Sequence, residues 1–305
     1  MIKEAMLYEK LSDGLVRCCL CAHYCVIDLS EKGFCRVRQN IKGILKTLTY
    51  AEAAAVHIDP IEKKPLYHFF PGTLTYSIAS RGCNFKCGFC QNWQISQISN
   101  VVAPFMEQRM SFSTNELGSY TQPELIPEDI VQETKRNNLE SISYTYTEPT
   151  VFFEYAYDTA KLAKQQGIKN IFVTNGYMTK QALEAINPYL DAANVDLKSF
   201  REEFYLKNCQ AHLAPVLETI KLMKKMGIWL EITTLVIPGE NDSESELKGI
   251  AGFIAGIDKE IPWHISKFSP CYEFTNYEPT PIETLQKAYN IGKEQGLLHV
   301  YLGNV

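Results

Sequence analysis

Three cysteines in the stretch "RGCNFKCGFCQNW", residues 81–93, are the first candidates for chemistry in this chain. Cys83, Cys87 and Cys90 have the spacing C-x3-C-x2-C. Thiolates suit zinc, copper(I) and iron–sulfur clusters, and a structural zinc site or a fully ligated four-iron cube takes four protein ligands. This loop supplies three, so it can hold three irons of a [4Fe-4S] cluster and leave the fourth open to a reactant. The alternative is a zinc site that a distant Cys or His completes.

A second group of cysteines lies near the start of the chain. Four of them have the spacing C-x2-C-x3-C-x9-C: Cys18, Cys21, Cys25 and Cys35. Cys19 and His23 lie in the same stretch and are spare ligands. Four cysteines in so short a segment indicate a metal that stabilises a region too small for its own core. The spacing is compatible with zinc or with a second iron–sulfur cluster.

The elements that must position these residues alternate along the chain. Apolar runs at 74–80, 141–147, 170–175, 193–199, 229–237, 263–269 and 299–304 indicate strands. Amphipathic segments between them begin near a proline (Pro127, Pro215, Pro281), and the last two end in a glycine, which is typical of helices. Continuous apolar strands joined by helices predict an α/β fold with a parallel sheet, either open or closed into a full or partial barrel. In both, functional residues collect at the carboxyl ends of the strands.

The chain divides into two regions of different character. Residues 1–70 lack the strand–helix alternation and carry half of the cysteines, which predicts a small cysteine-rich, metal-binding appendage. Residues 71–305 form the α/β domain, with the boundary near Pro71. Residues 94–126 predict a long polar connection after the first strand, and connections of this length are usually functional or mobile.

Composition excludes several other classes. The net charge is −5, from 30 Lys and Arg against 35 Asp and Glu, and the sequence has no long run of basic residues. Both observations argue against nucleic acid as the main partner. The first residues lack the apolar core of a secretory signal, and no run of about 18 apolar residues predicts a membrane span. We therefore expect a cytoplasmic protein, in which ten cysteines indicate metal binding rather than disulfides.

The loop CNFKCGFC resembles the signature of the radical SAM superfamily, C-x3-C-x-aromatic-C, with Phe89 at the aromatic position. The resemblance implies a partial (βα)6 barrel like that of a TIM barrel. It also implies that S-adenosylmethionine binds the open iron of a [4Fe-4S] cluster. One electron then cleaves this cofactor to methionine and a 5′-deoxyadenosyl radical, which takes hydrogen from a substrate.

Further strand ends fit this resemblance. Glu148 and Pro149 fall where the family's GGEP segment contacts the methionine amino group, although Tyr146 and Thr147 replace the two glycines. From the residues alone, Glu148 could also be a first-turn glutamate that the helix dipole stabilises.

The ends of the third to sixth strands resemble the branch of activating enzymes for glycyl-radical enzymes, which includes the activating enzyme of pyruvate formate-lyase. The resemblance implies cofactor contacts from Thr174 and Asn175, and from Asp196 and Lys198 near the methionine carboxylate. The branch usually has Asp where this chain has Val173, so the sequence does not decide whether this chain has the monovalent cation site of the branch. Plain readings remain for each motif: Asn-Gly is a common turn, and Asp-x-Lys can be an ordinary ion pair.

Two residues near the sixth strand are further candidates. His264 is a candidate contact to the cofactor, although a lone strand histidine is commonly a core residue. Cys271 follows this strand and could reach a substrate, but it reads equally as an ordinary loop cysteine.

The amino-terminal pattern CxLCxHxC…GFCxVR, together with CQNWQIS after the cluster loop, resembles the radical SAM member of the AmmeMemoRadiSam system over nearly the whole chain. Such relatives often continue with another cysteine pair, so ending at Val305 predicts a short or shortened form. The resemblance implies a flavodoxin- or ferredoxin-type electron donor and a protein substrate or Memo-like partner.

We therefore expect an activase-like radical SAM oxidoreductase whose substrate is a protein glycyl site, a partner protein or a small molecule. The competing hypothesis is a non-catalytic iron–sulfur or zinc protein that transfers electrons or binds partners.

Overall fold

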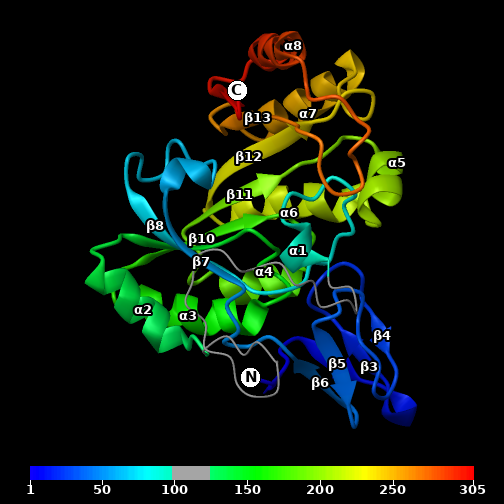
Figure 1. Ribbon diagram of the computed structural model, residues 1–305, viewed down its shortest axis with the longest axis vertical. Coiled ribbons are helices and arrows are strands. Elements are labelled where there is room, and N and C mark those ends of the chain that lie inside the picture. Colours follow the sequence, from blue (N-terminus) through cyan, green and yellow to red (C-terminus); the bar gives the residue numbers. More distant parts are fainter. Residues whose placement is uncertain (98–123) are drawn as a thin grey trace.

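The structure is a computed structural model that describes residues 1–97 and 124–305. Within these residues the largest sheet has the strand order β14-β13-β12-β11-β10-β9-β8-β7 and runs through the centre of the molecule (Figure 1). Its strands are β7 Ala55–Pro60, β8 Leu74–Ala79, β9 Ser141–Tyr144, β10 Lys169–Thr174, β11 Ala192–Asp196, β12 Trp229–Val236, β13 Trp263–Lys267 and β14 Val300–Gly303.

Strands β8 to β14 pair in parallel, and β7 pairs antiparallel with β8. Strand β9 buries all of its residues and β10 and β11 bury most of theirs, as expected for strands covered on both faces. Each of β8 to β13 is followed by a helix before the next strand, and β14 ends the series. This arrangement confirms the predicted partial (βα)6 barrel.

The helices connect successive strands. The crossover helices are α2 Pro127–Arg136, α3 Phe153–Gln165, α4 Lys180–Ile186, α6 Leu213–Lys225, α7 Glu244–Ile257 and α8 Ile282–Glu294, and the short helices are α1 Trp93–Ser96 and α5 Glu202–Phe204. Local chemistry explains their starts. Pro127 occupies the first turn of α2, and the side chains of Thr179 and Ser243 cap α4 and α7 by accepting backbone N–H bonds.

The amino-terminal residues form two small antiparallel sheets, visible at the lower right of Figure 1. One has the order β1-β6-β5 and the other β2-β3-β4; their strands are β1 Lys3–Glu4, β2 Tyr8–Lys10, β3 Val16–Cys18, β4 Val26–Ile27, β5 Arg38–Ile41 and β6 Ile44–Thr47. Strand β7 lies before residue 70 but belongs to the large sheet, so the expected boundary falls between two paired strands. The division into two units stays a prediction. Most of the expected connection at 94–126 lies outside the described residues.

The segment after β7 packs beneath the barrel. Ile61 and Leu66 form a buried cluster with Ile171 and Ala192, which lie near the starts of β10 and β11. The N–H groups of Tyr67 and His68 donate to the carboxylate of Glu231 in β12. The chain that precedes the barrel therefore closes the amino-terminal ends of its strands.

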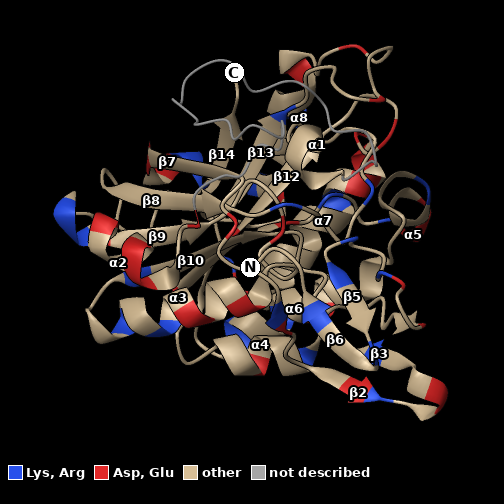
Figure 2. Ribbon diagram, turned by 60° about the horizontal axis from the view of Figure 1, so that its bottom comes forward, with Lys and Arg blue, Asp and Glu red and all other residues tan. Residues whose placement is uncertain are grey.

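Acidic and basic side chains are interspersed along α2, α3 and α4 in Figure 2. In the described part of the chain, every helix is too short or too polar to cross a membrane.

A buried ion pair joins the amino-terminal sheets to α3. The two terminal nitrogens of Arg38, Nη1 and Nη2, donate to the Glu154 carboxylate at 2.9 and 2.8 Å. The Arg38 side chain is 2% exposed and that of Glu154 is 1% exposed. The N–H of Met6 also donates to Glu154, and Arg38 donates to the Met6 carbonyl. This pair fixes the first strands against the outer face of the barrel.

Glu154→Gln should lower the free energy of unfolding by about 3–5 kcal/mol, because it leaves the buried Arg38 charge without its partner. The measurement is urea unfolding followed by circular dichroism. Glu184→Gln is the matched control, since Glu184 pairs with Lys180 at the surface and should contribute less than about 1 kcal/mol. Equal effects of the two variants would contradict the role of the buried pair.

Candidate functional site

The three-cysteine loop follows β8 and lies at the carboxyl ends of the parallel strands. The N–H of Phe85 points at the Cys83 sulfur at 3.3 Å, and Cys90 Sγ lies 3.1 Å from Ser96 Oγ. The loop packs tightly, because a Cβ added at Gly88 would lie 2.8 Å from the Phe274 ring. A side chain at this position would therefore displace the loop.

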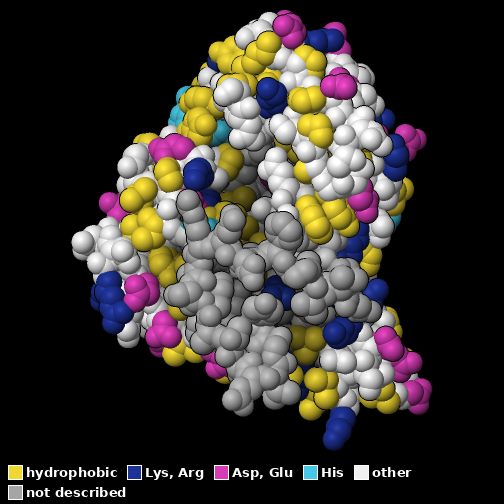
Figure 3. Space-filling view, in the orientation of Figure 1, with side chains coloured by type: hydrophobic (Ala, Val, Ile, Leu, Met, Phe, Trp, Pro, Cys, Tyr) yellow, Lys and Arg dark blue, Asp and Glu magenta, His cyan; other side chains and the backbone are white. Residues whose placement is uncertain are grey.

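A cavity of about 690 Å³ opens beside this loop. The face of the molecule that is turned toward the viewer in Figure 3 is hollowed above its centre. The cavity is lined by every main-site residue that the sequence predicts: Cys83, Cys87, Phe89, Cys90, Glu148, Thr174, Asn175, Asp196, Lys198 and His264. Cys271 does not line it; its thiol donates to the Phe89 carbonyl.

Glu148 is the centre of a buried polar network. Its Oε1 accepts bonds from the N–H and hydroxyl of Thr150 and from the Thr174 hydroxyl, and its Oε2 accepts from the Asn175 N–H at 2.7 Å. Burial raises the pKa of Glu148, although these four donors favour the charged form. The carboxylate therefore binds the end of β9 to the end of β10.

Asn175 extends this network to the cysteine loop. Its Nδ2 donates to Asn84 Oδ1 at 2.7 Å and lies 3.8 Å from the Cys83 sulfur. Asn84 is fully buried and also donates to the Tyr177 carbonyl. The ends of β8, β9 and β10 are thus connected by a continuous set of side chains, of which Glu148, Thr174 and Asn175 line the cavity.

Asp196 and Lys198 lie on the next strand end. Lys198 Nζ is 2.9 Å from Asp196 Oδ2 and 5.8 Å from the centre of the Phe89 ring. Burial disfavours the charged ammonium, but the Asp196 carboxylate outweighs it and raises the pKa of Lys198 well above its usual value. The pair presents both a cation and an anion to the cavity.

Tyr146 has a backbone conformation that glycine usually supplies. Its φ is 62°, in the left-handed region. Its hydroxyl donates to Asp59, the Lys64 ammonium lies 4.3 Å from its ring centre, and its carbonyl accepts from Asn92 Nδ2. Burial would raise the pKa of Asp59, but bonds from Lys64 and Tyr146 lower it below its usual value. Side-chain bonding therefore holds Tyr146 where the family pattern has glycine.

His264 lies near the amino-terminal end of β13, away from the mouth. Its Nε2 is 2.7 Å from Glu231 Oε2, and its ring contacts those of Tyr67 and Tyr301. It faces the same cavity as the cysteines but from the opposite end of the strands.

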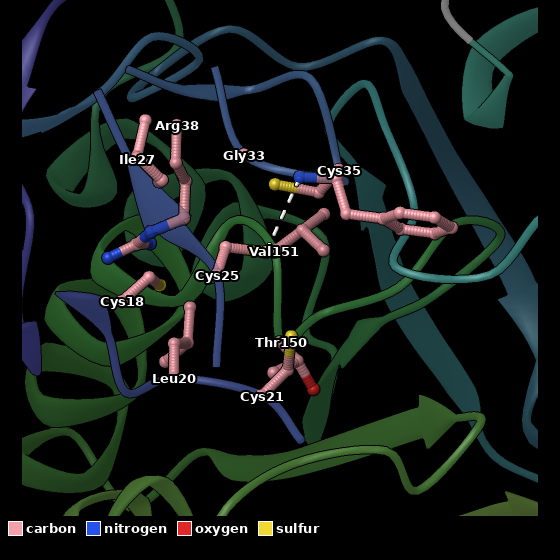
Figure 4. Close-up of a pocket in the computed structure, with 11 residues that line it drawn as sticks. Cys18, Leu20, Cys21, Cys25, Ile27, Gly33, Cys35, Arg38, Thr150 and Val151 are labelled. Carbon is pink, nitrogen blue, oxygen red and sulfur yellow. Dashed lines mark hydrogen bonds between the residues drawn. The ribbon is translucent and has the colours of Figure 1, made fainter. Parts of the chain in front are cut away.

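The amino-terminal cysteines line a second, separate cavity. Cys18, Cys21, Cys25 and Cys35 surround it together with Arg38 (Figure 4). In the described residues, no three or more Cys, His, Asp or Glu side chains are grouped so that they could hold one metal ion as they stand. This statement covers both this group and the three-cysteine loop.

Sequence reasoning missed several residues that contact and support the residues lining the main cavity. Cys209, in the turn Tyr205–Cys209, has its sulfur 3.7 Å from that of Cys87. Asn84 and Asp59 are the other polar groups that the motifs did not indicate. No local pattern marks Cys209 or Asp59, whereas a polar residue inside the cysteine loop could have drawn attention to Asn84.

Tyr146→Phe should lower the free energy of unfolding by about 2 kcal/mol, because it removes a charge-assisted bond to the buried Asp59. Chemical unfolding checks this. Tyr8→Phe is the control, since the Tyr8 hydroxyl donates to an exposed carboxylate, that of Glu4, and its loss should cost less than about 0.5 kcal/mol. A Tyr146→Phe protein as stable as Tyr8→Phe would contradict this account of the turn.

Comparison with known proteins agrees with this geometry. An uncharacterized protein of Methanocaldococcus jannaschii is 46% identical over 100% of this chain and 86% of its own length. A putative glycyl-radical enzyme activating enzyme of the same organism is 26% identical over 75% of this chain and 78% of its own. The crystal structure of a radical SAM methyltransferase from Sphaerobacter thermophilus aligns with a TM-score of 0.57 over 99% of this chain and 76% of that one, at 11% identity. At that identity the likeness shows the fold alone.

The pattern of the family described as the radical SAM superfamily matches residues 77–248. This stretch is more than half of the chain. It begins in β8, includes the three-cysteine loop and continues past the polar ends of β9, β10 and β11. The chain therefore belongs to the radical SAM superfamily.

Proposed function

We propose that this protein is a radical SAM enzyme that uses a [4Fe-4S] cluster on Cys83, Cys87 and Cys90 to cleave S-adenosylmethionine reductively. The observation that carries the proposal is the single cavity onto which the cysteine loop and the next three strand ends open. Three thiols suit three irons of a cluster, and Gly88 leaves room for the loop's tight path, because a Cβ there would meet Phe274. The residues present therefore fit the group.

When bound, a reduced cluster held by Cys83, Cys87 and Cys90 would supply the one electron that breaks the C–S bond of S-adenosylmethionine, so that the adenosyl fragment could take a hydrogen atom from a substrate. The electron comes from a flavodoxin- or ferredoxin-type donor.

The chain's own residues would orient the amino-acid part of this cofactor. Both Glu148 oxygens already accept bonds, but Oε2 accepts only one, from Asn175, and retains a lone pair for an ammonium group. Lys198, which follows β11, offers a cation to the carboxylate of S-adenosylmethionine. The Asp196 carboxylate, 2.9 Å away, keeps the Lys198 ammonium in place. Phe89 supplies an apolar wall next to the Lys198 ammonium. In this assignment Thr174 and Asn175 act mainly by fixing Glu148.

We further propose an activase-like activity on a protein or small molecule. The related putative activating enzyme supports this direction. SuiB from Streptococcus suis, which shares the fold at 14% sequence identity, has been solved bound to S-adenosylmethionine and bound to the precursor peptide SuiA. The likeness to the AmmeMemoRadiSam member, with a Memo-like partner, remains part of this proposal.

The amino-terminal cysteines are the second part of the cofactor proposal, as a zinc ion or a second cluster. They line a different cavity from the three-cysteine loop. The radical chemistry proposed here therefore does not require their direct contact with S-adenosylmethionine.

Anaerobically reconstituted protein, reduced with dithionite and given S-adenosylmethionine, should form 5′-deoxyadenosine, detected by chromatography. Cys90→Ala should abolish this product and lower bound iron, because it removes one of three ligands. Cys271→Ala is the control, since this thiol does not line the cavity, and it should retain both. A fully iron-loaded wild-type protein that forms no product would favour the non-catalytic alternative.

Glu148→Gln should retain its iron but bind S-adenosylmethionine at least about 10-fold more weakly, because an amide does not pair with an ammonium as a carboxylate does. Equilibrium dialysis measures the affinity. Glu231→Gln is a matched control. Glu231 is also fully buried and accepts four bonds, from Tyr67, His68, Trp229 and His264, but it lies outside the cavity lining. Equal weakening in both variants would mean that Glu148 acts only through stability.

A further inference from the structure

The four amino-terminal cysteines come from separate turns but face one space. Cys18 ends β3, Cys25 precedes β4, and Cys21 and Cys35 lie in the loops between strands. Figure 4 shows their side chains arranged around the cavity. Cys18 and Cys25 are also tied by a backbone bond of 2.9 Å, which closes the turn that carries Cys21. The fold therefore gathers thiols that are up to 17 positions apart.

The backbone around this cavity is shaped for a sulfur-bound group. The N–H of Phe34 points at the Cys25 sulfur at 3.5 Å, a bond that stabilises a thiolate more than a neutral thiol. Gly33 lets the chain approach, because a Cβ there would lie 3.2 Å from Ile27 and 3.8 Å from the Cys25 sulfur. A larger residue at this position would have to displace the Ile27 side chain, which also lines the cavity.

Arg38 provides a second, independent sign of an anionic occupant. Its two terminal nitrogens are used by Glu154 and the Met6 carbonyl, but its buried Nε has no partner among the described residues. Arg38 is 2% exposed and lines the same cavity as the thiols. A buried N–H without an acceptor costs about 1–3 kcal/mol. Thiolates around a metal would supply the missing acceptor.

The cysteine-bearing turn is bonded to the loops of the main site. Thr179 donates from its N–H to the Leu20 carbonyl and from its hydroxyl to the Cys19 carbonyl. The backbone of Cys21 forms an isolated antiparallel β-bridge with that of Met178. His23 Nε2 bonds the Asn84 carbonyl at 2.7 Å. Asn84 is the residue whose side chain holds Asn175.

On the other side, the cavity is bounded by Thr150 and Val151, just after Glu148. The four thiols thus lie behind the loops that follow β8, β9 and β10.

We propose that Cys18, Cys21, Cys25 and Cys35 bind a thiophilic metal centre that clamps the loops of the radical site from behind. The shared chemistry is tetrathiolate ligation, which zinc and an iron–sulfur cluster both accept. In the described residues, the four sulfur atoms are not close enough together to ligate one ion without a shift of side chains. The same is true of the three cysteines of the family motif. The proposal deepens the second part of the cofactor proposal, and because this centre is distinct from the main site, its test is independent of S-adenosylmethionine cleavage.

The test uses full-length protein with Cys83, Cys87 and Cys90 changed to Ala, which cannot load the main cluster. After anaerobic purification this protein should retain about one zinc, or iron and acid-labile sulfide in equal amounts, per chain. Zinc without colour identifies a single ion, and a brown protein with sulfide identifies a cluster. No metal above background would overturn the proposal.

Cys21→Ser with Cys35→Ser in this background should lose at least 90% of the metal. Cys19→Ser with Cys271→Ser is the matched control, because it also removes two thiols; Cys19 is as buried as Cys18, at 6% exposure, but does not line the cavity. Metal retained after the first pair of changes, or lost equally after the second, would assign it to adventitious binding.

The clamp is tested in the same background protein, with no further substitution. A chelator should remove the metal from the folded background protein and accelerate hydrogen exchange at the Ala22 and Thr179 amides, which bond across the two segments, at least 10-fold. Adding metal back should restore protection. Unchanged exchange after complete metal removal would overturn the clamp.

Discussion

The carboxylate of Glu148 is the interaction on which the site depends. It is buried beside two strand ends, where an isolated charge would be costly, and four donors from Thr150, Thr174 and Asn175 offset that cost. Because those donors come from two different strand ends, the charge can stay buried only if β9 and β10 keep their register. Asn175 then reaches Asn84, so the position of the cysteine loop follows from the same carboxylate.

Residues of the amino-terminal region support this arrangement in two places. Inside the barrel, Asp59 and Lys64 hold the unusual backbone of Tyr146. Outside it, Arg38 fixes the small sheets to α3, and the turn around Cys21 contacts the loop that follows Asn175. The site is thus a set of short loops that gain precision from bonds to parts of the chain far away in sequence.

Much of this could be predicted from the sequence, because the relevant signals are local. Apolar runs and helix starts predict the parallel strands, and the position of Cys83, Cys87 and Cys90 directly after the first of them predicts that they lie at the carboxyl ends of the sheet. Strand-end polarity correctly brings Glu148, Asn175 and Lys198 to the same cavity. These inferences rest on the rule that parallel strands end at one edge.

What sequence reasoning missed depends on contacts between distant residues. The antiparallel strand β7 has a weak pattern, since exposed and buried residues do not alternate along it. Cys209 approaches Cys87 only through the fold, and the bond from Tyr146 to Asp59 joins residues 87 positions apart. His264 was a candidate contact to the cofactor, and the strand boundaries, which the sequence does not give, place it near the start of β13, beside Glu231.

The antiparallel pairing of β7 also bears on how the chain can be shortened. A fragment that starts at β8 would expose six residues of backbone donors and acceptors along a sheet edge, an invitation to pair with other chains. It would also lose Ile61 and Leu66 from beneath Ile171 and Ala192, uncovering apolar surface at the base of the barrel. The smallest self-sufficient barrel in this protein therefore starts upstream of Ala55, inside the region whose composition looks like an appendage.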